Sequence, residues 1–185
     1  MTPTHPAAAL PRRLATRLET SRRLDRPTHA LRRAAAQLDR VPALRALLRG
    51  EPLGHAAHPL MTDAPLGMWT SAMVLDLTAG EQGRAAADRL VGLGVLSALP
   101  AALTGLADWS GSPARVARVG TAHAALNSVA LGLYSASWLL RRRGSRGLGV
   151  LVGLAGGGAV AASGYLGGHL AFVQRAPRHA KPLAD

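Results

Sequence analysis

Residues 147–174 read GLGVLVGLAGGGAVAASGYLGGHLAFVQ, a run of 28 positions without Asp, Glu, Lys or Arg. Two further uncharged runs occupy residues 90–107 and 119–140, and a fourth apolar run, 60–79, contains only Asp63 and Asp76 as charged residues. A helix of about 20 apolar residues is long enough to cross the hydrocarbon core of a bilayer. The pattern therefore predicts an all-α integral membrane protein. We expect a bundle of four transmembrane helices at about residues 60–79, 88–107, 117–140 and 148–172.

The composition fits this class of protein. Apolar residues make up 48% of the 185 positions, whereas aromatic residues make up only 3%. A soluble bundle would need polar faces at helical spacing, and residues 148–163 show no such face. The chain has no cysteine, which excludes disulfides, thiolate metal sites, cysteine-ligated iron–sulfur clusters and cysteine nucleophiles.

Basic residues are concentrated before the first apolar run. Residues 1–50 contain 11 Arg against three acidic residues, a local charge of +8. Residues 31–48 alternate apolar residues with Arg at helical spacing, interrupted at Pro42, which is typical of an amphipathic helix. We divide the chain into a basic, Arg-rich N-terminal tail that is partly helical or disordered (1–52), a four-span membrane domain (53–174) and a short C-terminal tail (175–185).

Anionic lipid or a protein such as a redox partner would suit the basic N-terminal tail. Nucleic acid is disfavoured, because residues 1–60 contain no aromatic side chain that could stack on bases. Because the chain is predicted to span the membrane, its main expected partner is the lipid bilayer.

The distribution of basic residues also predicts the orientation. Four spans place both ends of the chain on one side, together with 16 Arg and Lys, against six on the other side. Because positively charged segments stay in the cytoplasm, we expect a multi-pass protein of the cell membrane with both termini cytoplasmic. We expect no cleavable signal peptide, since residues 1–50 lack an apolar core.

Small residues and prolines punctuate the predicted spans. The pairs Gly153/Gly157 and Gly164/Gly168 have the spacing that lets helices approach closely in a bilayer. Packing within the bundle is one interpretation of these glycines, and a homodimer contact is the other. In the first span, Pro59 and a second proline at position 65 predict an irregular segment over 59–64, with regular helix only from position 65.

Polar side chains are expected to collect near one face of the membrane. Four crossings bring the start of the first and third spans and the end of the second and fourth spans to the same face. At 1.5 Å per residue, His123 and His169 would each lie roughly 7–9 Å below that surface. Asn127 follows His123 by one turn on the same side of the helix. The complete set of candidate residues is His55, His58, Asp63, Asp108, His123, Asn127 and His169.

Ionisable groups inside a bilayer are costly and by default mark a site. Three interpretations stay open: a structural hydrogen-bond network, a b-type haem, and a transition metal ion or proton relay. For haem, we expect His123 and His169 as iron ligands, with the carboxylates accepting the free imidazole N–H groups. His55, His58 and Asn127 would complete the surroundings of the haem. A metal ion would instead draw its ligands from His55, His58, Asp63, Asp108, His123 and His169.

The sequence offers no catalytic motif: it lacks a nucleophile elbow, a phosphate-binding loop and a dinucleotide-binding fingerprint. It therefore favours a non-enzymatic protein. One interpretation is membrane electron transfer through the candidate residues named above, which we call the His/Asp layer. The alternative is a membrane anchor or scaffold in which that layer only holds the helices together.

Four stretches of the chain resemble a family of bacterial membrane proteins, domain of unknown function 2231. They are GHAAHPLMTDAPLGMWTSAMVLDL (54–77), LTGLADW (103–109), RVGTAHAALN (118–127) and GYLGGHL (164–170). The resemblance implies a four-span membrane domain whose biochemical role is not established. Some relatives are fused to a Rieske-type iron–sulfur domain, which implies electron transfer nearby. This chain has Ala56-Ala57 where the family commonly has Pro-Leu, and without cysteine it would need a separate redox partner.

Overall fold

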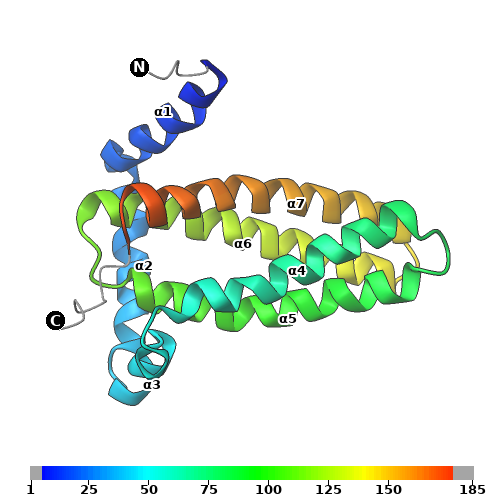
Figure 1. The fold of residues 1–185 in the computed structure, drawn as a ribbon, viewed down its shortest axis with the longest axis horizontal. Coiled ribbons are helices and arrows are strands. Elements are labelled where there is room, and N and C mark those ends of the chain that lie inside the picture. Colours follow the sequence, from blue (N-terminus) through cyan, green and yellow to red (C-terminus); the bar gives the residue numbers. More distant parts are fainter. Residues whose placement is uncertain (1–5, 177–185) are drawn as a thin grey trace.

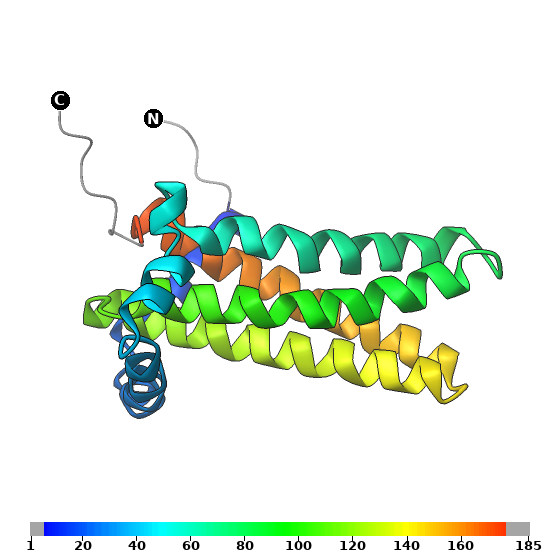
Figure 2. The same ribbon diagram turned by 90° about the horizontal axis from the view of Figure 1, so that it is seen from below.

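Four long helices lie side by side and run alternately in opposite directions (Figures 1 and 2). The structure is a computed structural model that describes residues 6–176, and within that range it contains helices and turns but no strand. A π-helical turn, His169–Val173, continues the last of the four. The four long helices are α4 (Ala57–Thr78), α5 (Arg84–Trp109), α6 (Ala114–Arg142) and α7 (Arg146–Gly168).

Two segments of the described chain are long and apolar enough to cross a membrane. They are Arg84–Trp109 and Arg146–Val173, which contain the second and fourth predicted spans. The first and third predicted spans lie in α4 and α6, where charged and polar residues such as Asp76 and Asn127 lower the hydropathy. The all-helical class and two candidate spans are therefore confirmed, whereas the complete four-span bundle stays a prediction.

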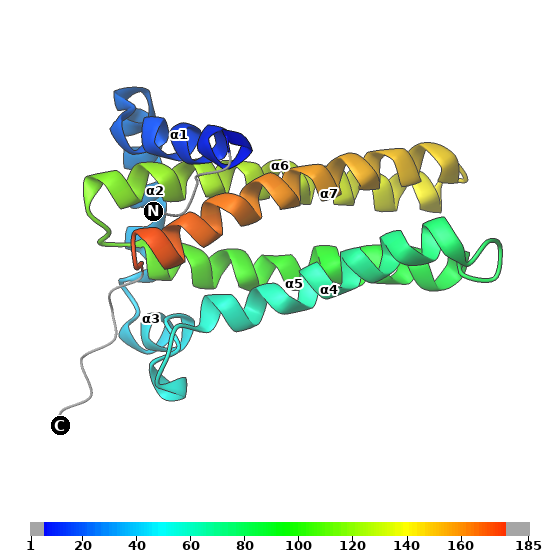
Figure 3. The same ribbon diagram turned by 45° about the horizontal axis from the view of Figure 1, so that its top comes forward.

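The basic N-terminal segment is helical and packs at one end of the long helices. It forms α1 (Pro6–Thr20), α2 (Asp25–Leu38) and α3 (Pro42–Leu48), with short 3₁₀ turns between α1 and α2 and after α3. In Figures 1 and 3, α2 runs across the end where α4 begins, and α1 turns back along the side of α6. The predicted break at Pro42 falls at the first residue of α3. The division at residues 52 and 174 stays a prediction, and residues 177–185 of the C-terminal tail lie outside the described range.

The predicted irregular segment over 59–64 is wrong, because α4 is continuous from Ala57. Pro59 lies in the first turn, where the backbone N–H has no partner inside the helix, so proline costs little there. Pro65 lies inside the helix and is buried, and the helix continues past it. Neighbouring helices can compensate for a proline inside a membrane helix.

Large apolar side chains point outward from the long helices, and small residues fill the interior. The fully or nearly fully buried positions include Ala72, Ala87, Ala130 and Ser163. This distribution is typical of helices that pack together within lipid, where close approach of backbones replaces a core of large residues. The exposed residues on the four helices include Leu60, Leu66, Val74 and Leu77; Leu93, Leu96, Leu99 and Leu103; Val129 and Leu139; and Leu148, Leu151 and Leu154.

Several rings in the interior pack against a glycine of a neighbouring helix. A Cβ atom added to Gly94 of α5 would overlap the indole Nε1 of Trp69 on α4. The Trp69 ring is stacked on Tyr134 with centroids 4.0 Å apart, and its indole donates to the carbonyl of Val91. The ring therefore has little freedom to move away. The same pairing recurs for Trp138 on Gly92, His58 on Gly105, Trp109 on Gly120, Tyr134 on Gly156 and His123 on Gly167.

The two glycine pairs noted in the sequence differ in their surroundings. A Cβ added to Gly153 would contact Ser137 of α6, and one on Gly157 would contact Tyr134. At Gly164, nothing lies within 4 Å of the position that a Cβ would take. The first pair therefore serves packing between α6 and α7, whereas the homodimer interpretation of the second pair stays a prediction.

Gly94→Ala should lower the apparent melting temperature of the detergent-purified protein, because the added methyl group overlaps the fixed Trp69 ring. Overpacking of this kind costs about 1–3 kcal/mol. Gly132→Ala is the matched control, since it also lies inside a long helix and has open space around its Cβ position. That control should be neutral or stabilising by about 0.5–1 kcal/mol. Equal melting temperatures for the two variants would contradict the packing described here.

Candidate functional site

Three polar side chains from α6 and α7 form a closed hydrogen-bonded group, the His123 cluster, made of His123, Asn127 and Ser163. The Asn127 amide donates to His123 Nε2 at 3.0 Å, and Ser163 Oγ donates to Asn127 Oδ1 at 2.7 Å. His123 Nε2 is then an acceptor, so the imidazole proton lies on Nδ1. His123 Nδ1 lies 2.9 Å from the carbonyl oxygen of Ser163, which accepts a hydrogen bond from Nδ1–H. Both ring nitrogens of His123 therefore have partners within the protein.

His58 of α4 lies next to the His123 cluster. The two imidazole rings are 6.4 Å apart between centroids and meet edge to face at 89°. His58 Nδ1 lies 2.9 Å from the carbonyl oxygen of Ala101, and Thr104 Oγ1 is 3.4 Å away. Gly105 leaves the space on α5 that the His58 ring occupies. The structure thus brings His58, His123 and Asn127 together, three of the residues that the sequence placed in one layer.

His169 has a different partner, on the N-terminal helix α1. Its Nε2 lies 2.7 Å from Oε1 of Glu19, and the side chains of His169 and Glu19 are only 5% and 16% exposed. Sequence analysis missed Glu19, because it belongs to the segment that was interpreted as a tail. This contact connects α1 to the π-helical turn that follows α7.

The remaining predicted residues are spread over the same end of the protein. His55 precedes α4 and is exposed, with its Nδ1 near the carbonyl oxygen of Ala56. Asp63 is exposed on α4, and Asp108 is buried near the end of α5. Within residues 6–176, no three His, Cys, Asp or Glu side chains lie close enough together to hold a metal ion.

Buried and partly buried contacts fasten the N-terminal helices to the long helices. Arg118 of α6 donates to both carboxylate oxygens of Asp25, at 2.7 and 3.2 Å, and to the carbonyl oxygen of Glu19. This hydrogen bond from Arg118 holds the pKa of Asp25 below its ordinary value. The hydroxyl groups of Thr28 and Thr121 lie 2.8 Å apart in a buried position between α2 and α6.

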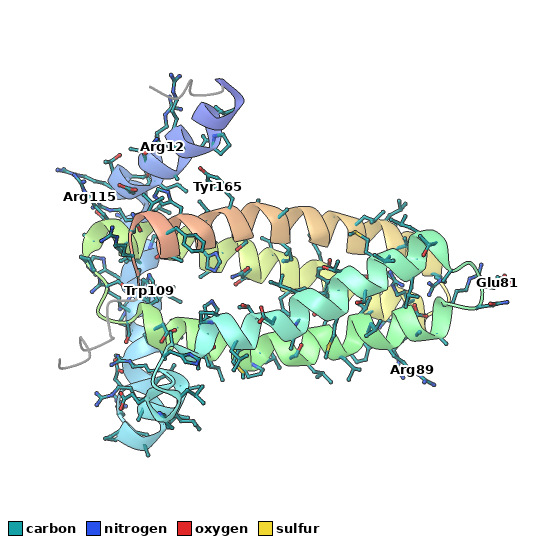
Figure 4. All side chains as sticks on the ribbon, in the orientation of Figure 1. Arg12, Glu81, Arg89, Trp109, Arg115 and Tyr165 are labelled. Atoms are coloured by element: carbon teal, nitrogen blue, oxygen red, sulfur yellow. The ribbon has the colours of Figure 1, made fainter. Side chains whose placement is uncertain are left out.

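Two arginines of the basic segment also face the protein rather than solvent. Arg49 donates to Ser110 Oγ at 2.7 Å and reaches the carbonyl oxygen of Ala107 at the end of α5. Arg32 lies over the indole ring of Trp109, with its guanidinium carbon 5.8 Å from the ring centroid. Figure 4 shows Trp109 at the end of the long helices that α2 crosses. These contacts identify α1–α3 as a docked part of the fold.

The opposite end contains a cluster of four charges, the Arg141 cluster: Asp76 of α4, Asp88 of α5, Arg141 of α6 and Arg146 of α7. Arg141 donates to both oxygens of Asp76, at 2.6 and 3.0 Å, and to Asp88 at 3.0 Å. Arg146 donates to Asp76 and to Asp88. The side chains of Arg141 and Asp76 are only 2% and 3% exposed. Each long helix therefore contributes one charge to a neutral group, in which Arg141 and Asp76 are buried and Arg146 and Asp88 are partly exposed.

A small cavity adjoins the Arg141 cluster. Trp69, Tyr134, Asp76 and Arg141 are among its lining residues, and it has room for about one water molecule. Sequence analysis noted Asp76 but did not pair it with Arg141. Their positions could have indicated the pair: Asp76 lies near the end of the run 60–79, and Arg141 directly follows the run 119–140. Four crossings bring these two ends to the same predicted membrane face.

Asp76→Asn should strongly destabilise the protein, because it removes a carboxylate from the buried Arg141 guanidinium. Breaking a buried ion pair from one side typically costs about 3–5 kcal/mol. Glu81→Gln is the matched control, since Glu81 lies nearby in the α4–α5 loop, pairs with Arg84 and has an 83% exposed side chain. Thermal unfolding in detergent should separate the two variants clearly. A melting temperature of Asp76→Asn equal to that of Glu81→Gln would show that the cluster does not hold the helices together.

Comparison with known proteins identifies the family of the chain. The matching family model, described as "Predicted membrane protein (DUF2231)", covers residues 54–178. This range begins just before α4 and includes all four long helices, whereas α1–α3 precede it. Comparisons with curated proteins and with solved structures give no match. Because the match covers more than half of the chain, the protein belongs to the predicted membrane protein family DUF2231.

Proposed function

We propose that this protein crosses the cell membrane four times and is a non-catalytic scaffold that holds a basic helical platform, α1–α3, at one membrane face. The observation that carries the proposal is the docking of this platform by Arg118, Arg49 and the Thr28–Thr121 contact. Most of the remaining arginines of α1–α3 are exposed and available to a partner. A rigid basic surface next to a bilayer suits anionic lipid or an acidic protein.

The apolar exterior supports four spans. Exposed leucines or valines lie on α4 and α6 as well as on the two helices that qualify as spans by their composition. The polar residues that lower the hydropathy of α4 and α6 include His58, Asp76, His123 and Arg141, each of which contacts a neighbouring helix. Polar groups that face other helices and not lipid are tolerated in membrane proteins.

The charge distribution supports the orientation with both termini in the cytoplasm. The side with the N-terminal platform contains 16 of the 22 basic residues of the chain. On the other side, Arg141 lies inside α6 and is paired with carboxylates, so it is not part of a loop. Its burial removes one of the basic residues that oppose this orientation.

The hydrogen bonding of the histidines favours a structural role for the His/Asp layer. To bind a haem iron, His123 would have to release Asn127 or Ser163, and His169 would have to release Glu19 if it used Nε2. The same rearrangement would be needed for a metal ion, for which the described residues offer no group of three ligands. As arranged, His123 fits neither cofactor, whereas a structural network requires no change.

A b-type haem and membrane electron transfer remain the second candidate function. The observation that favours it is the pair of imidazole rings, His58 and His123, 6.4 Å apart between the long helices. Under this hypothesis, His123 and His169 ligate the iron and a separate protein exchanges electrons with it.

An optical spectrum and a metal analysis of the detergent-purified protein, expressed with haem and metals supplied, separate the two candidates. The scaffold proposal predicts no Soret band and no stoichiometric zinc, iron or copper. It also predicts that His123→Leu lowers the melting temperature, because the buried Ser163 loses a hydrogen-bond partner, which costs about 1–3 kcal/mol. His55→Leu, at an exposed histidine, should leave the melting temperature unchanged. A Soret band that disappears in both His123→Ala and His169→Ala would contradict the scaffold and support haem.

A further inference from the structure

The first helix, α1, has two sides with different surroundings. One side is docked: Ala15 is fully buried against Val119 and Leu166, and Glu19 contacts His169. Beside it, Leu10 and Leu14 are 63% and 50% exposed although they are large apolar residues one turn apart. Nothing else in the described part of the chain covers these two leucines.

Arginines border the exposed leucines. On a helix with 100° between successive residues, Arg13 and Arg17 lie next to Leu10 and Leu14, on the side away from the docked face. Both arginines are exposed. An apolar strip next to a basic strip on one helix is the pattern of a helix that lies in the plane of a membrane surface.

The position of α1 also fits the membrane surface. Figure 3 shows α1 lying along the side of α6 instead of beyond the end of the long helices. Tyr165 of α7, which is 43% exposed, lies near α1 in Figure 4. Tyrosine is enriched at the level of lipid headgroups, so α1 is placed where the acyl chains meet the phosphates.

We propose that α1 is an interfacial helix that binds anionic phospholipid, with Arg13 and Arg17 on headgroup phosphates and Leu10 and Leu14 among the upper acyl carbons. This inference rests on the proposed four-span arrangement and names the partner of one part of the platform. Guanidinium groups suit phosphate, because they offer several donors in a fixed plane. The long stems of Arg13 and Arg17 let their charged heads reach the phosphates while the helix stays lower.

Lipid titration tests the chemistry of binding. Phosphatidylglycerol added to the detergent-purified protein should raise its melting temperature more than phosphatidylcholine does, because a ligand that binds the folded state stabilises it. The double variant Arg13→Gln/Arg17→Gln should lose at least half of the phosphatidylglycerol-induced shift. Arg33→Gln/Arg40→Gln is the matched control, since it removes the same charge from exposed positions of α2 and the following turn. Equal losses in the two double variants, or no shift in the original protein, would overturn the proposal.

Spin labels test the depth of α1, and the chain suits them because it contains no cysteine. In phosphatidylglycerol vesicles, a nitroxide at Leu14→Cys should collide more with oxygen, and one at Thr16→Cys more with a water-soluble nickel complex. A label at Leu96→Cys, exposed in the middle of α5, reports whether that helix lies in the membrane. Lipid contact at position 96 with water contact at position 14 would overturn only the inference about α1. Water contact at position 96 would overturn the proposed membrane arrangement instead.

Discussion

The arrangement of the four long helices depends on the buried guanidinium of Arg141. It lies between carboxylates of α4 and α5, and Arg146 of α7 completes the group. An unpaired charge at this depth would be expensive in protein and more so in lipid. The four helices must therefore meet at this end with one register, because only that register brings two carboxylates and two guanidinium groups together. At the opposite end, Arg118 and Arg49 form hydrogen bonds that hold the N-terminal platform against the long helices.

Between the two charged ends, the helices are held by close packing and neutral hydrogen bonds. Rings of one helix fill the space that glycines leave on the next, as Trp69 does on Gly94. Only 3% of the residues are aromatic, and 21 are glycine. This packing explains how such a chain forms a defined interior. The His123 cluster follows the same logic, since its polar atoms bond to each other across α6 and α7. A molecule built in this way has leucines on the outside of its long helices and arginines on the N-terminal platform at one end.

Sequence patterns that repeat within one helix could be predicted, and contacts between distant segments could not. Three uncharged runs and the apolar run 60–79 located the four long helices. His58 and His123 were expected in one layer and do lie together, but their matched depth had paired His123 with His169 and not with His58. The irregular start at Pro59 was wrong, because a proline in a first turn leaves the helix intact. The partner of His169 was missed, since the Glu19 contact depends on how α1 folds back. The pairing of Asp76 with Arg141 needed the register of α4 against α6, which no local pattern contains.

The number of crossings is the central claim, and reporter fusions measure it most directly. A reporter that distinguishes cytoplasm from the outside would be fused after Gly83, Ser112, Ser145 and Asp185 in separate proteins. Four spans with both termini cytoplasmic predict cytoplasmic signals at Ser112 and Asp185 and outside signals at Gly83 and Ser145. If only α5 and α7 crossed the membrane, Ser112 and Ser145 would report the same side. That result would contradict the four-span scaffold.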